Sequence, residues 1–143
     1  MHGVNLDRLG ERNPLVYGSD TLIDLEAKIT AFARDLGIEV FCHQTNHEGE
    51  MVEHLHELRG TTDGLIINAG AWTHYSYGIR DAIEYTELPF AEVHLSDIMA
   101  REPWRHVSVF ADIETRVIEV HGKGAEGYRE ALIALNEHFG KGA

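Results

Sequence analysis

The chain has 143 residues, of which 43% are hydrophobic and 25% charged, a balance typical of one globular domain and unlike that of a disordered segment. Its 12 basic and 24 acidic residues give a formal net charge of −12, which disfavours binding to nucleic acids and to anionic membranes. The single cysteine, Cys42, excludes an internal disulfide, and no apolar run is long enough to span a bilayer. We therefore expect one domain over residues 1–143, located in the cytoplasm, with neither nucleic acid nor a membrane as a partner.

Two kinds of segment alternate along the chain. Residues 1–20 have the composition of a loop, rich in asparagine, aspartate, glycine and proline. After them, short runs rich in β-branched residues, typical of buried strands, alternate with longer segments that carry an apolar residue every three or four positions, typical of helices. The predicted elements are, in chain order, helix 22–36, strand 38–42, helix 47–58, strand 64–68, helix 76–86, strand 90–94, strand 117–121 and helix 125–139.

Helices of ten or more residues between strands indicate right-handed crossovers and a parallel sheet. We therefore predict an α/β fold with a doubly wound parallel sheet in three layers. Such a sheet normally begins with a strand that becomes central, yet nothing strand-like precedes the loop of residues 1–20. Either the start of the chain is truncated or misassigned, or the sheet has lost its first strand.

Polar side chains gather where the predicted strands end. In open parallel sheets, ligands bind beyond the carboxyl ends of the strands. The residues at these ends, together with those of the first loop if it follows a missing strand, are Asn5, Arg12, Tyr17, Asn68, Thr73, His74, Glu92, His94, Ser96, Arg101 and Arg105. Amides, imidazoles, guanidinium groups and a phenol on one rim suit an acid–base enzyme that acts on an oxygenated, anionic molecule.

Glu92 and His94 are two positions apart in a predicted strand and therefore share one face. Glu92 can then hold a ring nitrogen of His94 and fix its tautomer or charge. The alternative is that both side chains only satisfy buried polarity.

Two patterns that suggest a cofactor or a metal do not fit their context. The glycine-rich run 122–127 matches the dinucleotide-binding pattern, but only 16 residues follow it, too few for a second βα unit. Histidines cluster between residues 43 and 56, yet His54 and His56 point about 200° apart on a helix, and there is no second cysteine. Cys42, inside a predicted strand, is expected to be a buried, unreactive thiol. We expect neither a cofactor nor a metal.

Several segments match the pattern of one enzyme family. They are residues 3–12 (GVNLDRLGER), 17–18 (YG), 44–50 (QTNHEGE), 67–74 (INAGAWTH), 92–96 (EVHLS), 101–106 (REPWRH) and 124–128 (GAEGY). The chain thus closely resembles the type II 3-dehydroquinate dehydratases, which are small flavodoxin-like enzymes of the shikimate and quinate pathways. The matching segments cover nearly the whole chain in family order.

The resemblance implies dehydration of 3-dehydroquinate to 3-dehydroshikimate. This reaction removes a proton next to a ketone and expels a hydroxyl from the neighbouring carbon. Tyr17 is implied as the base, and Arg12, on the same mobile loop, as the cation that favours its phenolate and closes the site. Asn5 is implied to position a water against the enolate. His94, held by Glu92, is implied to give a proton to the departing hydroxyl.

The resemblance also implies how a small anionic substrate is bound. The residues implied to hold the substrate carboxylate are Asn68 and, through their backbone amides, Leu95 and Ser96. Those implied to hold its ring hydroxyls are His74, Arg105 and Asp81, the last reaching in from a neighbouring subunit. Family members form trimers that associate into a dodecamer. Residues 1–20 are implied to form an N-terminal loop and active-site lid, and the reaction needs no metal or cofactor.

The chain departs from the family pattern outside the implied catalytic residues. The usual first hydrophobic strand is missing. Asp97 stands for a usual asparagine and Val107 for a usual histidine, while Arg116, Glu119 and His121 are unusually polar around the last strand. Two alternatives therefore stay open: a catalytically silent binding protein of the same fold, and a flavodoxin-like nucleotide binder.

Overall fold

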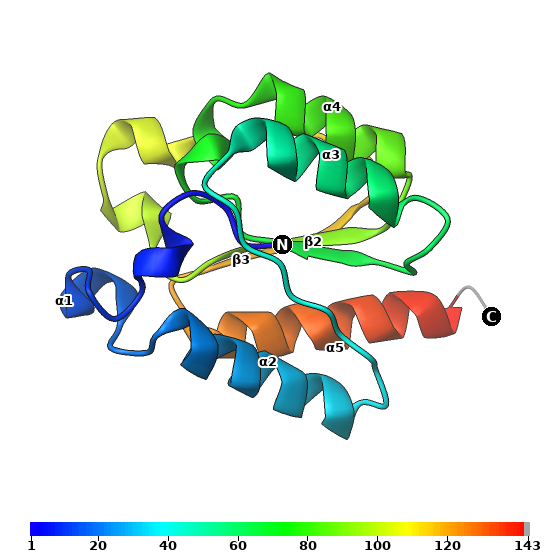
Figure 1. Ribbon diagram of the computed structural model, residues 1–143, viewed down its shortest axis with the longest axis horizontal. Coiled ribbons are helices and arrows are strands. Elements are labelled where there is room, and N and C mark those ends of the chain that lie inside the picture. Colours follow the sequence, from blue (N-terminus) through cyan, green and yellow to red (C-terminus); the bar gives the residue numbers. More distant parts are fainter. Residues whose placement is uncertain (142–143) are drawn as a thin grey trace.

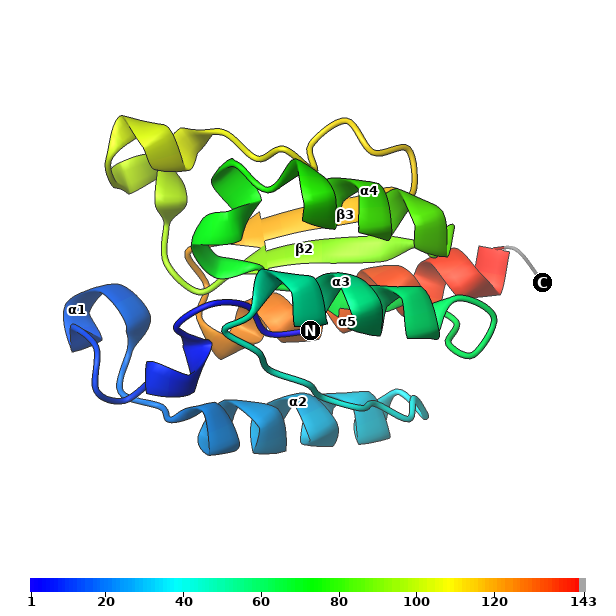
Figure 2. The same ribbon diagram turned by 45° about the horizontal axis from the view of Figure 1, so that its top comes forward.

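The computed structural model describes residues 1–141 and has helices on both faces of one parallel sheet (Figure 1). The strands are β1 (Leu65–Ile67), β2 (Phe90–His94) and β3 (Arg116–His121). The α-helices are α1 (Pro14–Tyr17), α2 (Leu22–Asp35), α3 (Glu48–Leu58), α4 (Tyr77–Thr86) and α5 (Ala125–Lys141). Within residues 1–141 the sheet has three strands in the order β1-β2-β3. The helices α3 and α4 cover one face, and α2 and α5 cover the other (Figures 1 and 2). The predicted three-layer α/β fold is confirmed.

Short 3-10 helices lie between these elements. They are η1 (Leu6–Arg8), η2 (Gly70–His74), η3 (Ile98–Ala100) and η4 (Pro103–His106). The first loop is therefore not wholly irregular, because it contains both η1 and α1. Asn13 accepts a hydrogen bond from the backbone of Leu15, and Pro14 occupies the first turn of α1, which is where proline suits a helix.

Local sequence signals set the ends of the long helices. Thr21 and Asp24 form a capping box at the start of α2, in which each side chain accepts a hydrogen bond from the other's backbone N–H. Gly37 follows the helix with a φ of +72°, a conformation that favours glycine. The predicted boundaries of this helix agree with the structure to within one residue because these signals are local.

The central strand β2 separates two apolar cores. Phe90 packs among residues of α3 and α4 such as Met51 and Ile83. Ala91 and Val93 point to the other face, where they belong to the core that α2 and α5 complete. Every residue of β2 is buried, so its carboxyl end lies deep between the two helical layers. Among the described residues, no helix is both long and apolar enough to cross a membrane.

The predicted strand 38–42 is wrong. These residues have no regular secondary structure, because the neighbour with which they would pair is reduced to a single position. His2 forms isolated parallel bridges with Gln44 and Asn68, and its N–H donates to the carbonyl of His43 at 2.8 Å. A β-branched run cannot form a strand without a partner for its backbone groups. Among residues 1–141 no strand precedes β1 in the chain, which agrees with the expectation that the usual first strand is truncated.

A cavity lies beside the place that a first strand would occupy. Its volume is about 570 Å³, and residues 38–43, residues 64–66 and the apolar side chains Leu132, Leu135 and Phe139 of α5 line it. Phe41 is 83% exposed, and Cys42 is an exposed thiol rather than the buried one expected from the sequence. Apolar surface therefore lies uncovered on this side of the sheet, next to β1.

Candidate functional site

A second cavity, of about 100 Å³, lies where β1 and β2 end. The first loop, η2 and the segment after β2 surround it. The sequence-predicted site residues that line it are Asn5, Arg12, Tyr17, Asn68, His74, His94, Leu95, Ser96 and Arg105. The structure therefore brings together residues from four separate parts of the sequence, as the carboxyl-end rule for parallel sheets predicts.

Arg12 and Tyr17 are in direct contact at one side of this cavity. The Arg12 Nη2 atom donates a hydrogen bond of 2.7 Å to the Tyr17 hydroxyl oxygen. The Arg12 guanidinium carbon also lies 3.8 Å from the centre of the Tyr17 ring, and that of Arg101 lies 5.1 Å from it. The helix α1 ends at Tyr17 and holds it close to Arg12. Two guanidinium groups thus lie against the ring of one phenol, and one of them donates a hydrogen bond to its oxygen.

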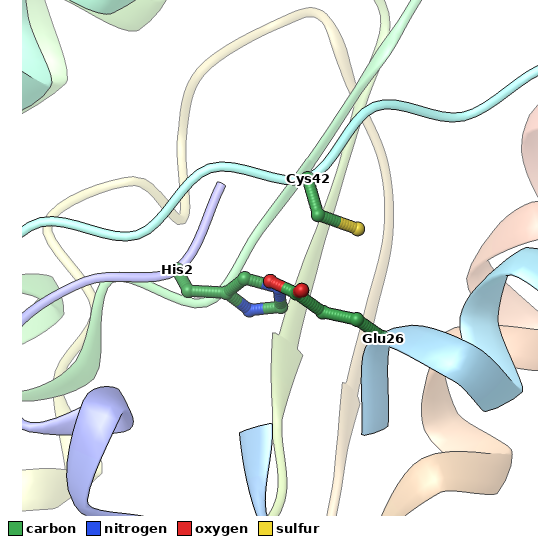
Figure 3. Close-up of side chains that lie close together, drawn as sticks. All are labelled: His2, Glu26 and Cys42. Atoms are coloured by element: carbon green, nitrogen blue, oxygen red, sulfur yellow. The ribbon is translucent and has the colours of Figure 1, made fainter. Parts of the chain in front are cut away.

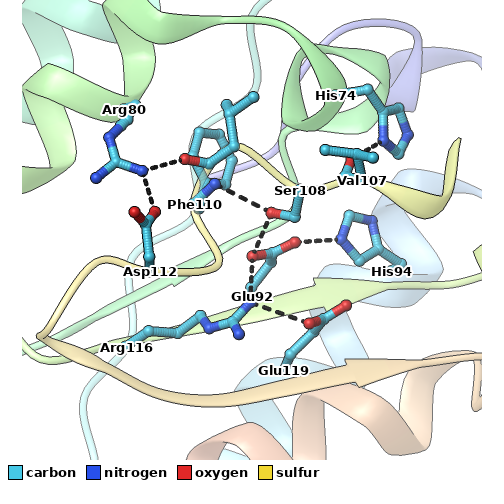
Figure 4. A network of polar contacts seen from close by, with 11 residues as sticks. His74, Arg80, Glu92, His94, Val107, Ser108, Phe110, Asp112, Arg116 and Glu119 are labelled. Atoms are coloured by element: carbon cyan, nitrogen blue, oxygen red, sulfur yellow. Dashed lines mark hydrogen bonds and ion pairs between the residues drawn. The ribbon is translucent and has the colours of Figure 1, made fainter. Parts of the chain in front are cut away.

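Glu92 and His94 form a buried pair at the end of β2 (Figure 4). The Nε2 atom of His94 lies 2.7 Å from Glu92 Oε2. The other carboxylate oxygen of Glu92 accepts hydrogen bonds from Ser108 Oγ at 2.9 Å and from Arg116 Nη1 at 3.1 Å. His94 also lines the cavity, so one ring nitrogen is fixed by Glu92 while the ring faces the site.

Glu92 is fully buried, yet it is held as a carboxylate. Burial alone raises its pKa, but the hydrogen bond and charge of His94, the Ser108 hydroxyl and the charge of Arg116 outweigh burial and bring the pKa below its usual value. The ionised Glu92 can only accept hydrogen bonds, so His94 Nε2 carries the hydrogen of their contact.

His74 faces His94 across the cavity. The two ring centres are 6.4 Å apart, and His74 Nδ1 lies 2.7 Å from the carbonyl oxygen of Val107. That nitrogen must therefore carry a hydrogen, which leaves Nε2 as an acceptor in the neutral ring. Burial lowers the pKa of His74, and the hydrogen bond to Val107 opposes this shift only in part. The two histidines of the site are thus held at different nitrogens, His74 at Nδ1 by Val107 and His94 at Nε2 by Glu92.

Asn68 and Gly70 shape the turn that follows β1. The Asn68 Oδ1 atom accepts a hydrogen bond of 3.1 Å from the Gly70 N–H, which orients the amide group. Gly70 has a φ of +62°, and a Cβ placed there would come within 2.7 Å of the carbonyl oxygen of Val4. The turn can therefore approach the first loop this closely only with glycine at this position.

The loop that carries Asn5 is held by residues 44–46, which follow the irregular segment 38–43. Asn5 has a left-handed backbone with a φ of +68°, and its N–H donates to Asn46 Oδ1 at 2.9 Å. Gln44 Nε2 donates to the carbonyl of Gly3 at 3.2 Å. The QTN segment, 44–46, thus acts as a support for the first loop, a role that its residue types alone did not indicate.

Positive charge is concentrated at the cavity despite the acidic chain. Arg12, Arg101 and Arg105 line it. Arg101 Nη1 donates to Ser96 Oγ at 3.1 Å, and Arg105 Nε donates to Glu102 at 2.8 Å. These cations suit an anionic ligand.

Three predicted site residues do not line the cavity: Thr73, Asp81 and Glu92, the last of which contacts His94 from behind. Asp81 is the farthest from its implied role, because among residues 1–141 it has no contact with the other site residues of its own chain. It lies on the exposed surface of α4. Conversely, Ser108 and Arg116 contact Glu92 but were missed, since each is more than 15 positions from Glu92 and no spacing rule connects them. Arg101 was placed on the rim by sequence but was given no role.

Comparisons with known proteins identify relatives over nearly the whole chain. The family model described as "Dehydroquinase class II" matches residues 1–136. A "3-dehydroquinate dehydratase" of Anoxybacillus flavithermus is 46% identical over 135 residues, which is 94% of this chain and 90% of the relative. A "Catabolic 3-dehydroquinase" of Aspergillus clavatus is 47% identical over 138 residues, or 95% of this chain and 91% of the relative. The crystal structure of a type II dehydroquinase from Propionibacterium acnes superposes with a TM-score of 0.89 at 38% identity, covering 95% of this chain and 92% of that one.

Proposed function

Because the chain belongs to the class II dehydroquinase family, we propose that it is a hydro-lyase that converts 3-dehydroquinate to 3-dehydroshikimate in the shikimate or quinate pathway. The observation that carries this proposal is that Tyr17, paired with Arg12, and His94, paired with Glu92, line one cavity. A base and an acid are thus available to the same small molecule.

The first step is the removal of a proton from the carbon next to the ketone. The Tyr17 phenolate takes this proton, and the electron pair of the broken C–H bond moves onto the ketone oxygen to give an enolate. The contact between Arg12 and Tyr17, at 2.7 Å, supports this role because it stabilises the phenolate before the step. Asn5 holds a water against the enolate oxygen, where the dipole of the water stabilises the negative charge that develops in the transition state.

The second step is the departure of the neighbouring hydroxyl. The enolate re-forms the ketone, the new C=C bond forms, and the C–O bond breaks. His94 donates its proton to the leaving oxygen, which departs as water. The ionised Glu92 beside it accepts a hydrogen bond from His94 and orients the ring for this transfer.

The remaining site residues position the substrate. Its carboxylate binds to the side chain of Asn68 and to the backbone amides of Leu95 and Ser96. The arrangement of these groups around the turn after β1 and the end of β2 supports this assignment.

Its ring hydroxyls bind to His74 and Arg105. Asp81 joins them from a neighbouring subunit of a trimer, and the trimers associate into a dodecamer. The position of Asp81 on the exposed surface of α4 is compatible with service to another subunit.

Replacement of Tyr17 by Phe tests the reaction. The variant keeps the ring over which Arg12 lies but has no group to take the proton, so we expect turnover to fall by about 10³-fold with unchanged thermal stability. The growth of ultraviolet absorption from the conjugated product measures the rate. Tyr85→Phe on α4, outside the cavity, is the matched control and should be fully active. Undiminished turnover in Tyr17→Phe would remove Tyr17 from the base role.

Calorimetry separates the enzyme from a silent binding protein of the same fold. We expect binding of 3-dehydroquinate to be accompanied by the heat of turnover and by product. Tight binding without product over hours would instead assign the chain to the non-catalytic class.

A further inference from the structure

Three side chains that have no part in the proposed reaction meet near the first residues of the chain (Figure 3). His2 comes from the isolated bridge position, Glu26 from α2 and Cys42 from the segment 38–43, which has no regular secondary structure. A nitrogen of the imidazole, an oxygen of the carboxylate and the sulfur all lie within 4.8 Å of one another. The three residues are far apart in sequence, so no sequence motif predicts the cluster.

His2 is buried without the hydrogen bonds that a buried imidazole normally makes. Its side chain is only 3% exposed, and neither ring nitrogen has a hydrogen-bond partner among residues 1–141. The Nε2 atom faces Glu26 Oε1 at 3.4 Å. A buried polar group left without a partner costs free energy and points to a ligand that completes it.

The spacing of the donor atoms is close to that of a tetrahedral site. Zinc bonds of about 2.0–2.3 Å place neighbouring donors about 3.3–3.8 Å apart in a tetrahedron. The separation of 3.4 Å between His2 Nε2 and Glu26 Oε1 already lies in this range. A shift of about 1 Å brings the Cys42 sulfur into it. Such a shift needs no strand pairing to break, since residues 38–42 form none.

The donor types select the metal. A thiolate and an imidazole prefer zinc to magnesium or calcium, which favour oxygen ligands. A thiol binds zinc as the thiolate, so zinc must displace the proton of Cys42 on binding. Zn²⁺ with one thiolate and one carboxylate is neutral overall, which suits a partly buried position.

Access to the cluster is open. His2 and Cys42 both line the cavity of about 570 Å³, so a cation can reach the donors and a water can complete the fourth position. We propose that His2, Glu26 and Cys42 form a zinc site that fastens the segment 38–43 to α2 and to the first residues of the chain. The site serves stability, and it stands whether or not the chain is a dehydratase.

Metal titration of the tag-free protein, after treatment with a chelator, tests the site. We expect calorimetry to detect one Zn²⁺ per chain, with release of a proton and a higher melting temperature. Co²⁺ in the same site should give the strong visible bands of four-coordinate cobalt and a sulfur-to-metal charge-transfer band in the near ultraviolet.

Variants identify the ligands. Cys42→Ser, at an exposed position, should remove the charge-transfer band and weaken Zn²⁺ binding at least about 10-fold, and His2→Asn and Glu26→Gln should weaken it similarly. His54→Asn is the matched control because His43 and His54 stack with ring centres 3.9 Å apart and are the rival metal ligands nearby. Loss of binding in His54→Asn with none in Cys42→Ser would overturn the proposal, and so would the absence of any Zn²⁺ binding.

Discussion

Glu92 has no access to solvent, and its ionisation depends on three neighbours. Burial opposes the charge, whereas His94, Ser108 and Arg116 favour it and keep its pKa low. Arg116 is the only one of the three with a permanent charge. Its Nη1 atom also forms an ion pair with Glu119 Oε2 at 3.0 Å. The lowered pKa means that Glu92 stabilises the fold above the ordinary carboxyl pKa of about 4.3, and that this contribution is lost as the pH falls through the lower folded-state value.

Arg116→Gln therefore affects both stability and the acid side of the activity profile. Without the guanidinium, the pKa of Glu92 rises, so the acid limb of the pH–rate profile should move to higher pH. We also expect the free energy of unfolding to fall by about 2 kcal/mol, since a buried carboxylate loses its cation. Urea unfolding and initial rates between pH 4 and about 8 measure the two effects.

Arg129→Gln is the control for this prediction. Arg129 and Glu126 form an exposed pair at 3.9 Å on α5, and such pairs contribute little to stability. If Arg116→Gln lowers the free energy of unfolding no more than Arg129→Gln does, or if the acid limb does not move, Arg116 does not control the ionisation of Glu92.

Among the elements of the fold, strand β1 has the least support, because one of its edges is largely unpaired. In a parallel sheet, alternate residues turn their backbone groups to each edge. On the open edge, the backbone groups of Ile66 and Asn68 bond to Met1 and Gly3 and to no other residue in the range 1–141. The cavity of about 570 Å³ continues from Met1 along this edge. Its apolar lining is the kind of surface that a strand of β-branched residues covers.

Five β-branched residues fused ahead of Met1 should therefore stabilise the fold. Burial of about three side chains, offset by the entropy of ordering the extension, leaves an expected gain of about 1–3 kcal/mol. Thermal and urea unfolding measure it. An extension of five Gly and Ser residues is the control and should leave stability unchanged. Equal stability of the two fusions would show that the cavity does not accept a strand.

At the scale of the whole molecule, the proposed anionic substrate has to bind to a chain of net charge −12. Arg12, Arg101 and Arg105 gather at one cavity and supply the local positive potential that the rest of the surface opposes. The hydroxyl-binding role proposed for Asp81 needs a second subunit, because Asp81 does not line the cavity of its own chain.

Mixing two impaired variants tests whether Asp81 serves a neighbour. Asp81→Asn and Tyr17→Phe subunits are each expected to have low activity alone. In an equal mixture that is dissociated and reassembled, about a quarter of the sites combine an intact Tyr17 with an intact neighbouring Asp81, so activity should return to that extent. Light scattering verifies that an oligomer forms. A fully active monomer, or a mixture no better than its parts, would exclude the role of Asp81.

Patterns within a few residues of one another were enough to predict much of this molecule. The alternation of strands and helices gave the three-layer parallel fold, the caps at Thr21 and Gly37 gave the bounds of α2, and the ends of β1 and β2 located Asn68, His74 and His94. Each of these features depends on local hydrogen bonding or on the period of apolar residues, which the sequence contains directly.

What only the tertiary structure decided are the features that need a distant partner. Residues 38–42 have the composition of a strand but no neighbour to pair with. Arg116 reaches Glu92 across 24 positions, and His2 meets Glu26 and Cys42 only after α2 has folded against the first residues. A strand, an ion pair or a ligand cluster exists only when chain segments far apart in sequence meet, and no local pattern records which segments those are.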